Sequence, residues 1–162
     1  MAIAVGDRIP DVKLMTMTGE GPAPVQSANA LGTGKVVLFA VPGAFTPTCS
    51  DHHLPGFVVR AGDLEDNGVD TIACISVNDA FVMGAWGQSQ NTGDSVVMLA
   101  DGNGDFAQAT GLTMDGSGFG LGTRSQRYAM IIDDGVVSWI GVEPGPGLNA
   151  SSADDVLAAL QS

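Results

Sequence analysis

The segment from residue 41 to residue 50, with the sequence VPGAFTPTCS, contains the residue types of a nucleophilic site. Its cysteine, Cys49, is one of only two in the chain, and a thiolate is a very good nucleophile. The apolar, β-branched run 35–41 precedes it and predicts a buried strand. Open α/β sheets place their sites at the carboxyl ends of such strands. We therefore interpret Cys49 as a reactive residue rather than a small core residue.

The residues beside Cys49 predict a helix start, which favours the thiolate. Pro47 biases Thr46 away from helical backbone, Thr48 is the expected N-cap, and Asp51 is expected to close a capping box. A thiol with a pKa of ~8.5 is only about 3% thiolate at pH 7. The first turn of a helix contributes ~0.3–1 kcal/mol, which is less than one pKa unit. A nearby cation, which lowers a pKa by ~1–3 units, is therefore expected.

The charge of the chain limits which residues can supply that cation and which classes of partner the protein can bind. The net charge is −12, from 18 acidic and 6 basic residues. A field of this sign repels phosphates, so nucleic acid and anionic membrane surfaces are disfavoured as partners. The first eight residues lack the pattern of a signal peptide or a myristoylation site, and two cysteines do not make a disulfide scaffold. The expected compartment is the reducing cytoplasm. The six bases are Arg8, Lys13, Lys35, Arg60, Arg124 and Arg127.

The apolar pattern predicts an α/β protein with a mixed sheet. Strands are predicted at 35–41, 69–77, 96–100, 127–133 and 136–142, and helices at 50–66, 79–90 and after Ser152. An Asp-Gly pair at 134–135 predicts a hairpin turn, and Ser152 with Asp155 predicts a capping box. Parallel βαβ units followed by an antiparallel hairpin favour helices on both faces of the sheet. The glycine-rich stretch 102–122 is expected to be irregular and exposed.

On these residues the sequence resembles the peroxiredoxin family. The pattern Pro-x-x-x-Thr-x-x-Cys is complete as Pro42, Thr46 and Cys49. The longer stretch 42–50, continuing into HLPGF at 53–57, is similar to the type-II branch, also called the peroxiredoxin-5 subfamily. The similar segments that follow are 74–82, 86–87, 99–101, 127–129 and 142–144, so the resemblance runs over nearly the whole chain.

The resemblance implies a thioredoxin-like α/β fold in a single domain over residues 1–162, with a mixed β-sheet flanked by helices. It implies a thiol peroxidase that reduces hydrogen peroxide and alkyl hydroperoxides, with Cys49 as the peroxidatic cysteine that becomes a sulfenic acid. Thr46 then offers its hydroxyl to the peroxide and the thiolate, Pro42 shields the site from water, and Arg127 supplies the expected cation. The family also implies a homodimer, and neither a cofactor nor a metal is expected.

One position departs from the branch. Many members carry a resolving cysteine in a Gly-Leu-Thr-Cys context, where this chain has Gly147-Leu148-Asn149-Ala150. Because Ala150 cannot form a disulfide, a one-cysteine cycle is favoured, in which an external thiol reduces the sulfenic acid. Glutathione with glutaredoxin is the first candidate reductant and thioredoxin is the second.

Several alternatives stay open beside this interpretation. Cys74 is interpreted as a buried structural thiol rather than a resolving one. Cys49 and His53 share a helix face, but two histidines are too few for a metal site, so His53 is expected at the site rim or in helix packing. Arg124 either supports the site or is a loop cation paired with acids. The second functional hypothesis is a redox-sensing or chaperone-like binding protein that signals through oxidised Cys49.

Three aromatic residues have no place in this chemistry. Phe81, Trp86 and Phe119 are expected in the core or on a family-type dimer surface. His52 is expected to be solvated.

Overall fold

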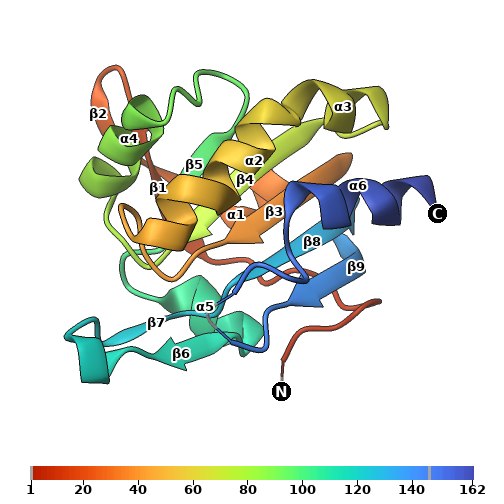
Figure 1. The fold of residues 1–162 in the computed structure, drawn as a ribbon. Helices are drawn as coiled ribbons and strands as arrows, with labels where there is room; N and C mark the ends of the chain where they lie inside the picture. Colours follow the sequence, from red (N-terminus) through yellow and green to blue (C-terminus); the bar gives the residue numbers. More distant parts are fainter. Residues whose placement is uncertain (1, 146) are drawn as a thin grey trace.

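The computed structural model describes residues 2–145 and 147–162, except for the side chain of Cys49. A seven-stranded sheet in the order β2-β1-β5-β4-β3-β8-β9 forms the centre of the molecule (Figure 1). The central strands β3, β4 and β5 are parallel, and the outer strands pair antiparallel. The expected mixed sheet is therefore confirmed. Its strands are β1 (Lys13–Thr18), β2 (Gly21–Gln26), β3 (Lys35–Ala40), β4 (Thr71–Ser76), β5 (Val97–Ala100), β8 (Tyr128–Asp133) and β9 (Val136–Val142).

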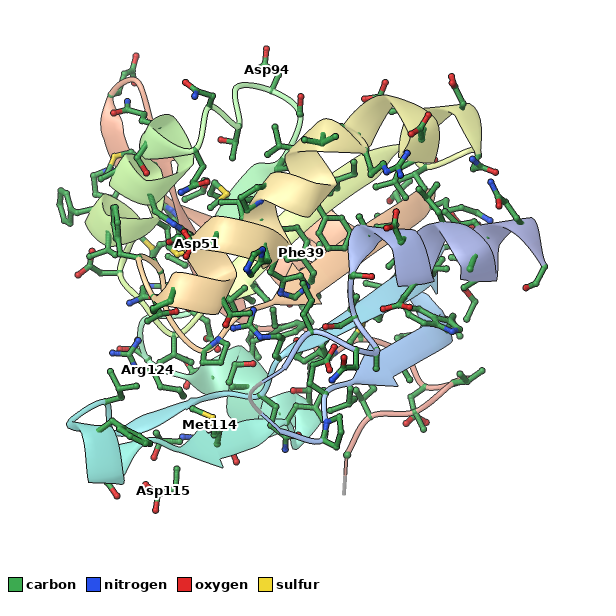
Figure 2. The ribbon with its side chains drawn as sticks, viewed as in Figure 1. Phe39, Asp51, Asp94, Met114, Asp115 and Arg124 are labelled. Atoms are coloured by element: carbon green, nitrogen blue, oxygen red, sulfur yellow. The ribbon has the colours of Figure 1, made fainter. Side chains whose placement is uncertain are left out.

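Helices cover both faces of this sheet (Figure 1). One face carries α2 (Leu54–Val59), α3 (Ala61–Asp66), α4 (Ala80–Ser89) and α6 (Ala153–Gln161), and the other carries α1 (Ser27–Leu31) and α5 (Asp105–Thr110). Residues of β3 alternate between the two apolar clusters, because successive side chains of a strand point to opposite faces. Phe39 packs beneath α2, where its ring stacks on Phe57 with centroids 4.0 Å apart (Figure 2).

The pairing of β3 with β8 sets the geometry of the candidate site. Ala40, the last residue of β3, lies opposite Tyr128, the first residue of β8. Arg127 directly precedes β8, and the segment 41–50 directly follows β3. Because the two strands are antiparallel, Arg127 and the start of this segment lie at the same edge of the sheet. Two stretches nearly eighty residues apart in sequence thus meet through one register.

The predicted hairpin between residues 133 and 136 is confirmed. Asp134 and Gly135 both have positive φ, 47° and 87°, as a type I′ turn requires. The strands β1 and β2 form a further hairpin that the apolar pattern did not indicate. β2 lies at the edge of the sheet, where Pro22 and Pro24 cost no central ladder hydrogen bonds.

The predicted single helix 50–66 is wrong in its continuity. The structure has a π-helical turn, η1 (Cys49–His53), followed by α2 and α3. Pro55 has no amide hydrogen for the carbonyl of Asp51, and its ring crowds that carbonyl, which accounts for the widened turn. At Arg60 the backbone, with φ −93° and ψ 7°, leaves helical geometry and separates α2 from α3. The apolar face over Leu54, Phe57 and Leu64 is nonetheless buried as expected.

The expectation for 102–122 is also wrong over its first half. Residues 105–110 form α5, and Phe106 and Leu112 are buried. The carboxylate of Asp101 accepts hydrogen bonds from the amides of Phe106 (3.0 Å) and Ala107 (2.9 Å), which satisfies two donors at the helix start. Gly104 and Gly111, with φ 74° and 73°, flank the helix in left-handed backbone. These glycines therefore delimit a helix instead of indicating irregular chain.

A second, two-stranded sheet follows α5. It consists of β6 (Thr113–Asp115) and β7 (Thr123–Ser125), joined through the 3-10 turn η2 (Ser117–Phe119). Within the described residues, no helix has the length and apolar character needed to cross a membrane.

The capping box predicted at Ser152 is present, and it gives a stability test. The Ser152 hydroxyl accepts from the amide of Asp155 (3.1 Å), and the Asp155 carboxylate accepts from the amide of Ser152 (3.1 Å). Ser152→Ala is expected to lower the free energy of unfolding by about 1 kcal/mol, measured by urea denaturation. The control Ser162→Ala, at the other end of the same helix, should change it by less than ~0.5 kcal/mol. Equal losses would contradict the capping role.

Candidate functional site

Two side chains from other parts of the fold hold the loop that precedes Cys49. The amide of Ala44 donates to Oδ1 of Asn78, at 3.0 Å, just beyond the carboxyl end of β4. Arg124, on β7, donates through Nη1 to the carbonyl of Pro42 at 3.3 Å. Figure 2 shows Arg124 and Met114 on one side of the small β6–β7 sheet and Asp115 on the other. Of the two interpretations of Arg124, the contact with Pro42 supports the one in which it assists the site.

The helix that carries Cys49 begins two residues earlier than predicted. Backbone at Pro47 is already helical, and the amide of Ser50 donates to the carbonyl of Thr46 at 2.9 Å. Thr46 therefore has the N-cap position that was expected of Thr48, and Pro47 suits the first helical position because its missing amide hydrogen is not needed there. The backbone of Cys49 lies in the first turn, as predicted, whereas its side chain is outside the described part of the structure.

The hydroxyl of Thr46 has a defined orientation. It donates to the carbonyl of Gly43 at 2.7 Å, within the loop. A hydroxyl has one proton, so in this arrangement its oxygen faces a ligand as an acceptor. The contact thus suits a partner that itself carries an O–H.

Arg127 and His53 are joined by a buried hydrogen bond. Arg127 is 7% exposed and His53 is 1% exposed. Nη1 of Arg127 donates to Nδ1 of His53 at 2.8 Å, and Nε2 of His53 lies 2.8 Å from the carbonyl oxygen of Ser151. Both partners require a neutral ring protonated on Nε2, since a carbonyl only accepts and a guanidinium only donates. His53 is thus part of the site. It lies deeper than the site rim, which was one of the two places where it was expected, the other being helix packing.

Burial and charge agree with that neutral ring. Burial disfavours the imidazolium, and the neighbouring Arg127 guanidinium repels it, so the pKa of His53 is lowered from 6.5 to about 3. The hydrogen bond to Ser151 and the Glu143 carboxylate act in the opposite direction and are outweighed. His52, the next residue, is exposed as expected.

Glu143 organises the chain segment that follows β9. Its carboxylate accepts from the amides of Asn149 (2.8 Å) and Ala150 (2.7 Å) and from the hydroxyl of Ser151 (2.7 Å). Burial alone raises the pKa of Glu143, but these donors favour the carboxylate and hold the pKa below its ordinary value. The amide of Glu143 donates to the carbonyl of Arg127 at 2.9 Å. Glu143 therefore ties the segment 149–151 to the strand position that carries Arg127.

A cleft of about 640 Å³ lies over these residues. Pro42, Thr46 and Arg127, three of the four predicted site residues, line it together. Apolar groups from the small sheet and the chain after β9 form much of the remaining wall. The cleft is lined by Pro42, Thr46, Pro47, Thr48, Thr113, Met114, Phe119, Gln126, Arg127, Glu143, Pro144 and Gly145. The structure thus brings together residues that the sequence separates by more than a hundred positions.

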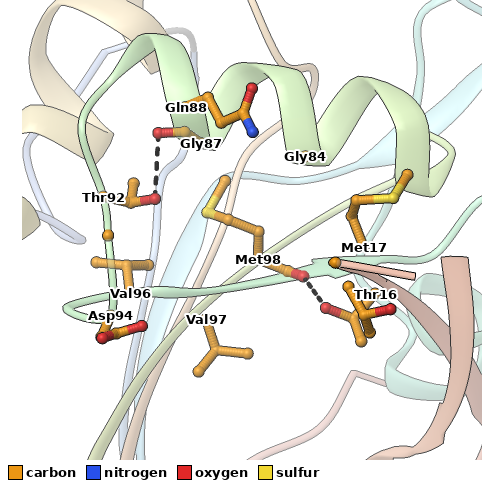
Figure 3. A pocket seen from close by; sticks show the side chains of 13 residues that line it. Thr16, Met17, Gly84, Gly87, Gln88, Thr92, Asp94, Val96, Val97 and Met98 are labelled. Atoms are coloured by element: carbon orange, nitrogen blue, oxygen red, sulfur yellow. Dashed lines mark hydrogen bonds between the residues drawn. The ribbon is translucent and has the colours of Figure 1, made fainter. Parts of the chain in front are cut away.

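A second hollow of about 460 Å³ lies between α4 and strands β1 and β5 (Figure 3). Gly84 and Gly87 line it, and a Cβ at either position would come within 3 Å of the side chain of Met17 or Met98. Hydroxyl groups there serve the backbone, as in the 3.1 Å bond from Thr92 to the carbonyl of Gly87. Asp94 is the only titratable residue among those that line it. Of the residues that the structure describes, no cysteine, histidine, lysine or arginine lines this hollow. The cleft at Arg127 is therefore the candidate active site.

Sequence reasoning missed four contributors to the site. Asn78, Glu143 and Ser151 were not singled out, and Ser50 was not expected to accept from the indole of Trp86 at 2.9 Å. Asn78 had a detectable signal, because it directly follows a predicted buried strand beside the strand that leads to Cys49. Glu143 lies in the similar segment 142–144, but nothing in that segment indicated its partners, and Ser151 had no signal, since only tertiary contacts give it a role. Trp86 itself is buried, whereas Phe81 and Phe119 are exposed.

The comparisons with known proteins agree with this geometry. The Redoxin family matches residues 4–157. Peroxiredoxin-2E, chloroplastic, of Arabidopsis thaliana is 49% identical over 98% of this chain and 70% of its own length. Peroxiredoxin-2B of the same plant is 46% identical over 98% of both chains. A crystal structure of reduced Prx3 in complex with H₂O₂ from Vibrio vulnificus is 53% identical, with a TM-score of 0.93, and the match covers 98% of this chain and 99% of that one.

The chain therefore belongs to the peroxiredoxins, with strong similarity to their type-II branch, and its fold is the thioredoxin-like fold of that family. Thiol-dependent peroxide reduction is the activity that this membership supports.

The lowered pKa of His53 predicts a pH dependence of stability. Between pH 6.5 and about 3 the unfolded chain binds a proton at residue 53 that the native protein does not bind. The native protein should thus become less stable as the pH falls through this window, by up to ~1.4 kcal/mol per pH unit from this group. His53→Phe keeps a ring but cannot titrate, so urea denaturation at several pH values should show a flatter dependence. His52→Gln, at an exposed neighbour, should keep the wild-type slope. Equal slopes in wild type and His53→Phe would contradict the assignment.

Proposed function

We propose that the protein is a thiol peroxidase that reduces hydrogen peroxide and alkyl hydroperoxides through Cys49 in a one-cysteine cycle. The observation that carries the proposal is the cleft in which Pro42, Thr46 and Arg127 converge beside the first helical turn at Cys49. The Vibrio relative bound to H₂O₂ supports peroxide as the substrate.

The residues of the cleft suit each part of that reaction. The Cys49 thiolate attacks one peroxide oxygen, so that an S–O bond forms, the O–O bond breaks, and the sulfur becomes a sulfenic acid. The departing oxygen carries negative charge and leaves as water or an alcohol after it takes a proton. Arg127 offers guanidinium donors to that charge and favours the thiolate beforehand. Thr46 accepts from the peroxide O–H, and Pro42 with its neighbours restricts water.

The apolar part of the cleft supports the alkyl hydroperoxides as substrates. Met114, Phe119 and Pro144 line it beside the guanidinium of Arg127. An alkyl chain would contact these groups while the peroxide group reaches the polar end.

An external thiol closes the proposed cycle. Position 150 is alanine, and Cys74 is fully buried in the middle of β4, so neither residue offers a sulfur at the surface. A first thiol condenses with the sulfenic acid to form a mixed disulfide and water, and a second thiol releases Cys49. Glutathione with glutaredoxin is our first proposed reductant and thioredoxin is the second, in a reducing cytoplasm.

Exposed aromatic rings support a homodimer. Phe45, Phe81 and Phe119 are 55%, 66% and 89% exposed, which is unusual for rings of this size. Phe45 also has a positive φ of 65°, an uncommon backbone for a side chain other than glycine. We propose that a second copy of the chain covers part of this apolar surface.

The two cysteines give the first test of this function. Cys49→Ser is expected to abolish peroxide turnover, and Cys74→Ser to keep most of it, because Cys74 lies in the core. Turnover is measured with hydrogen peroxide and either glutathione with glutaredoxin or thioredoxin as reductant. Comparable losses in two folded variants would contradict the assignment. A wild-type protein that is oxidised once but does not turn over with either reductant would favour the redox-sensing alternative.

The product of a single oxidation gives a second test. One equivalent of hydrogen peroxide without added thiol should convert Cys49 to a sulfenic acid, because the other cysteine of the chain, Cys74, is buried in β4. Trapping with a sulfenic-acid reagent followed by mass spectrometry detects it. A Cys49–Cys74 disulfide as the main product would show that Cys74 is a resolving cysteine and that the core opens to expose it.

A further inference from the structure

The hydrogen bonds of the site form a closed ring that passes through His53. Arg127 donates to Nδ1 of His53, and Nε2 of His53 donates to the carbonyl of Ser151. The hydroxyl of Ser151 donates to Glu143, whose amide donates back to the carbonyl of Arg127. Each member therefore restrains the next, and the ring returns to the residue whose guanidinium lines the cleft.

Packing fixes the plane of the His53 ring. Its centroid lies 5.0 Å from that of Phe39 and 5.6 Å from that of Phe57, and both rings are buried. With its two nitrogens bonded and its face packed, the imidazole has one orientation and one tautomer. The lone pair on Nδ1 is thus aimed at one place, which the Arg127 nitrogen occupies.

The charge state of His53 decides whether that acceptor exists. The charged groups that act on it are the Arg127 guanidinium and the Glu143 carboxylate. A proton on Nδ1 would turn the acceptor into a donor and oppose a cation at 2.8 Å. Burial and Arg127 keep the pKa of His53 at about 3, so the acceptor persists through the neutral and mildly acidic range.

We propose that His53 is the positioning residue of the site: its neutral imidazole, anchored on Ser151 and Glu143, holds the guanidinium of Arg127 in the cleft for the reaction at Cys49. This inference rests on the proposed function, because it gives a purpose to Arg127 only if Arg127 serves peroxide reduction. The segment 149–151 then supports the active site through Ser151 and Glu143. Other members of the branch carry a resolving cysteine in this region.

The two nitrogens of His53 can be tested separately by a matched pair of amides. H53N places Oδ1 at the same number of bonds from the backbone as Nδ1, so it keeps an acceptor for Arg127. H53Q places its amide NH₂ where Nε2 lies, so it keeps the donor to Ser151 and loses that acceptor. Both variants remove the ring, and both leave a cavity against Phe39 and Phe57. A purely structural role would therefore affect them similarly.

The measured quantity is the rate of Cys49 oxidation by hydrogen peroxide from pH 5 to pH 9, with folding checked by circular dichroism. We expect H53Q to be about 10- to 100-fold slower than wild type at pH 7, as for a misplaced catalytic group, and H53N to lose clearly less than H53Q because it keeps the acceptor for Arg127. We also expect the pH profile of H53Q to move to higher pH, since a displaced cation favours the thiolate less. Equal rates in the two folded variants would overturn the inference.

A background lacking the guanidinium separates the possible failures. R127Q should be slow by itself, and H53Q should add no further loss to it, because His53 acts through Arg127. This comparison also decides the matter if H53N does not fold. An additional loss in the double variant, or an R127Q protein as fast as wild type, would overturn the inference. Neither result would touch the proposed peroxidase function, which the turnover of the wild type and of the Cys49→Ser and Cys74→Ser variants tests separately.

Discussion

The antiparallel register of β3 and β8, with Ala40 opposite Tyr128, is the constraint on which the rest of the site depends. A strand that ends in the reactive loop and a strand that begins after the guanidinium must share one edge of the sheet for the two to meet. A slip of one residue would turn every side chain of β8 to the other face. Such a slip is costly because it would place side chains of different size and shape in each of the two close-packed apolar clusters. The core thus specifies the position of Arg127.

Register alone brings a long side chain near the cleft, but it does not aim it. The hydrogen-bonded ring through His53, Ser151 and Glu143 supplies that aim, with each donor matched to an acceptor. Its one buried carboxylate is stabilised by three donors from a single short segment, and its one buried imidazole stays neutral. A buried polar network is favourable only when its members are satisfied. In this arrangement the chain after β9 supports the candidate active site.

The errors of sequence reasoning have a common physical origin: local patterns predicted one backbone structure, and other residues gave these segments a different one. The many glycines of 102–122 indicated irregular chain, yet Gly104 and Gly111 delimit α5, whose start is held by the carboxylate of Asp101. The apolar face of 50–66 indicated one helix and gave the correct buried residues, while Pro55 and Arg60 divide it. Period and composition report which side chains are buried, and they do not report where the backbone ladder breaks.

The sequence by itself determined the five central and hairpin strands, the Asp-Gly turn, the capped final helix and the family signature of the segment 42–49, because these depend on neighbouring residues. It also predicted a cation near a catalytic Cys49, since a helix start shifts a thiol pKa too little. Only the tertiary structure decided that His53 is buried and neutral, that Glu143 and Ser151 anchor it, and that Asn78 and Arg124 hold the loop. These roles arise from contacts between residues far apart in the chain, and such contacts leave no periodic or spacing signal for sequence reasoning to detect.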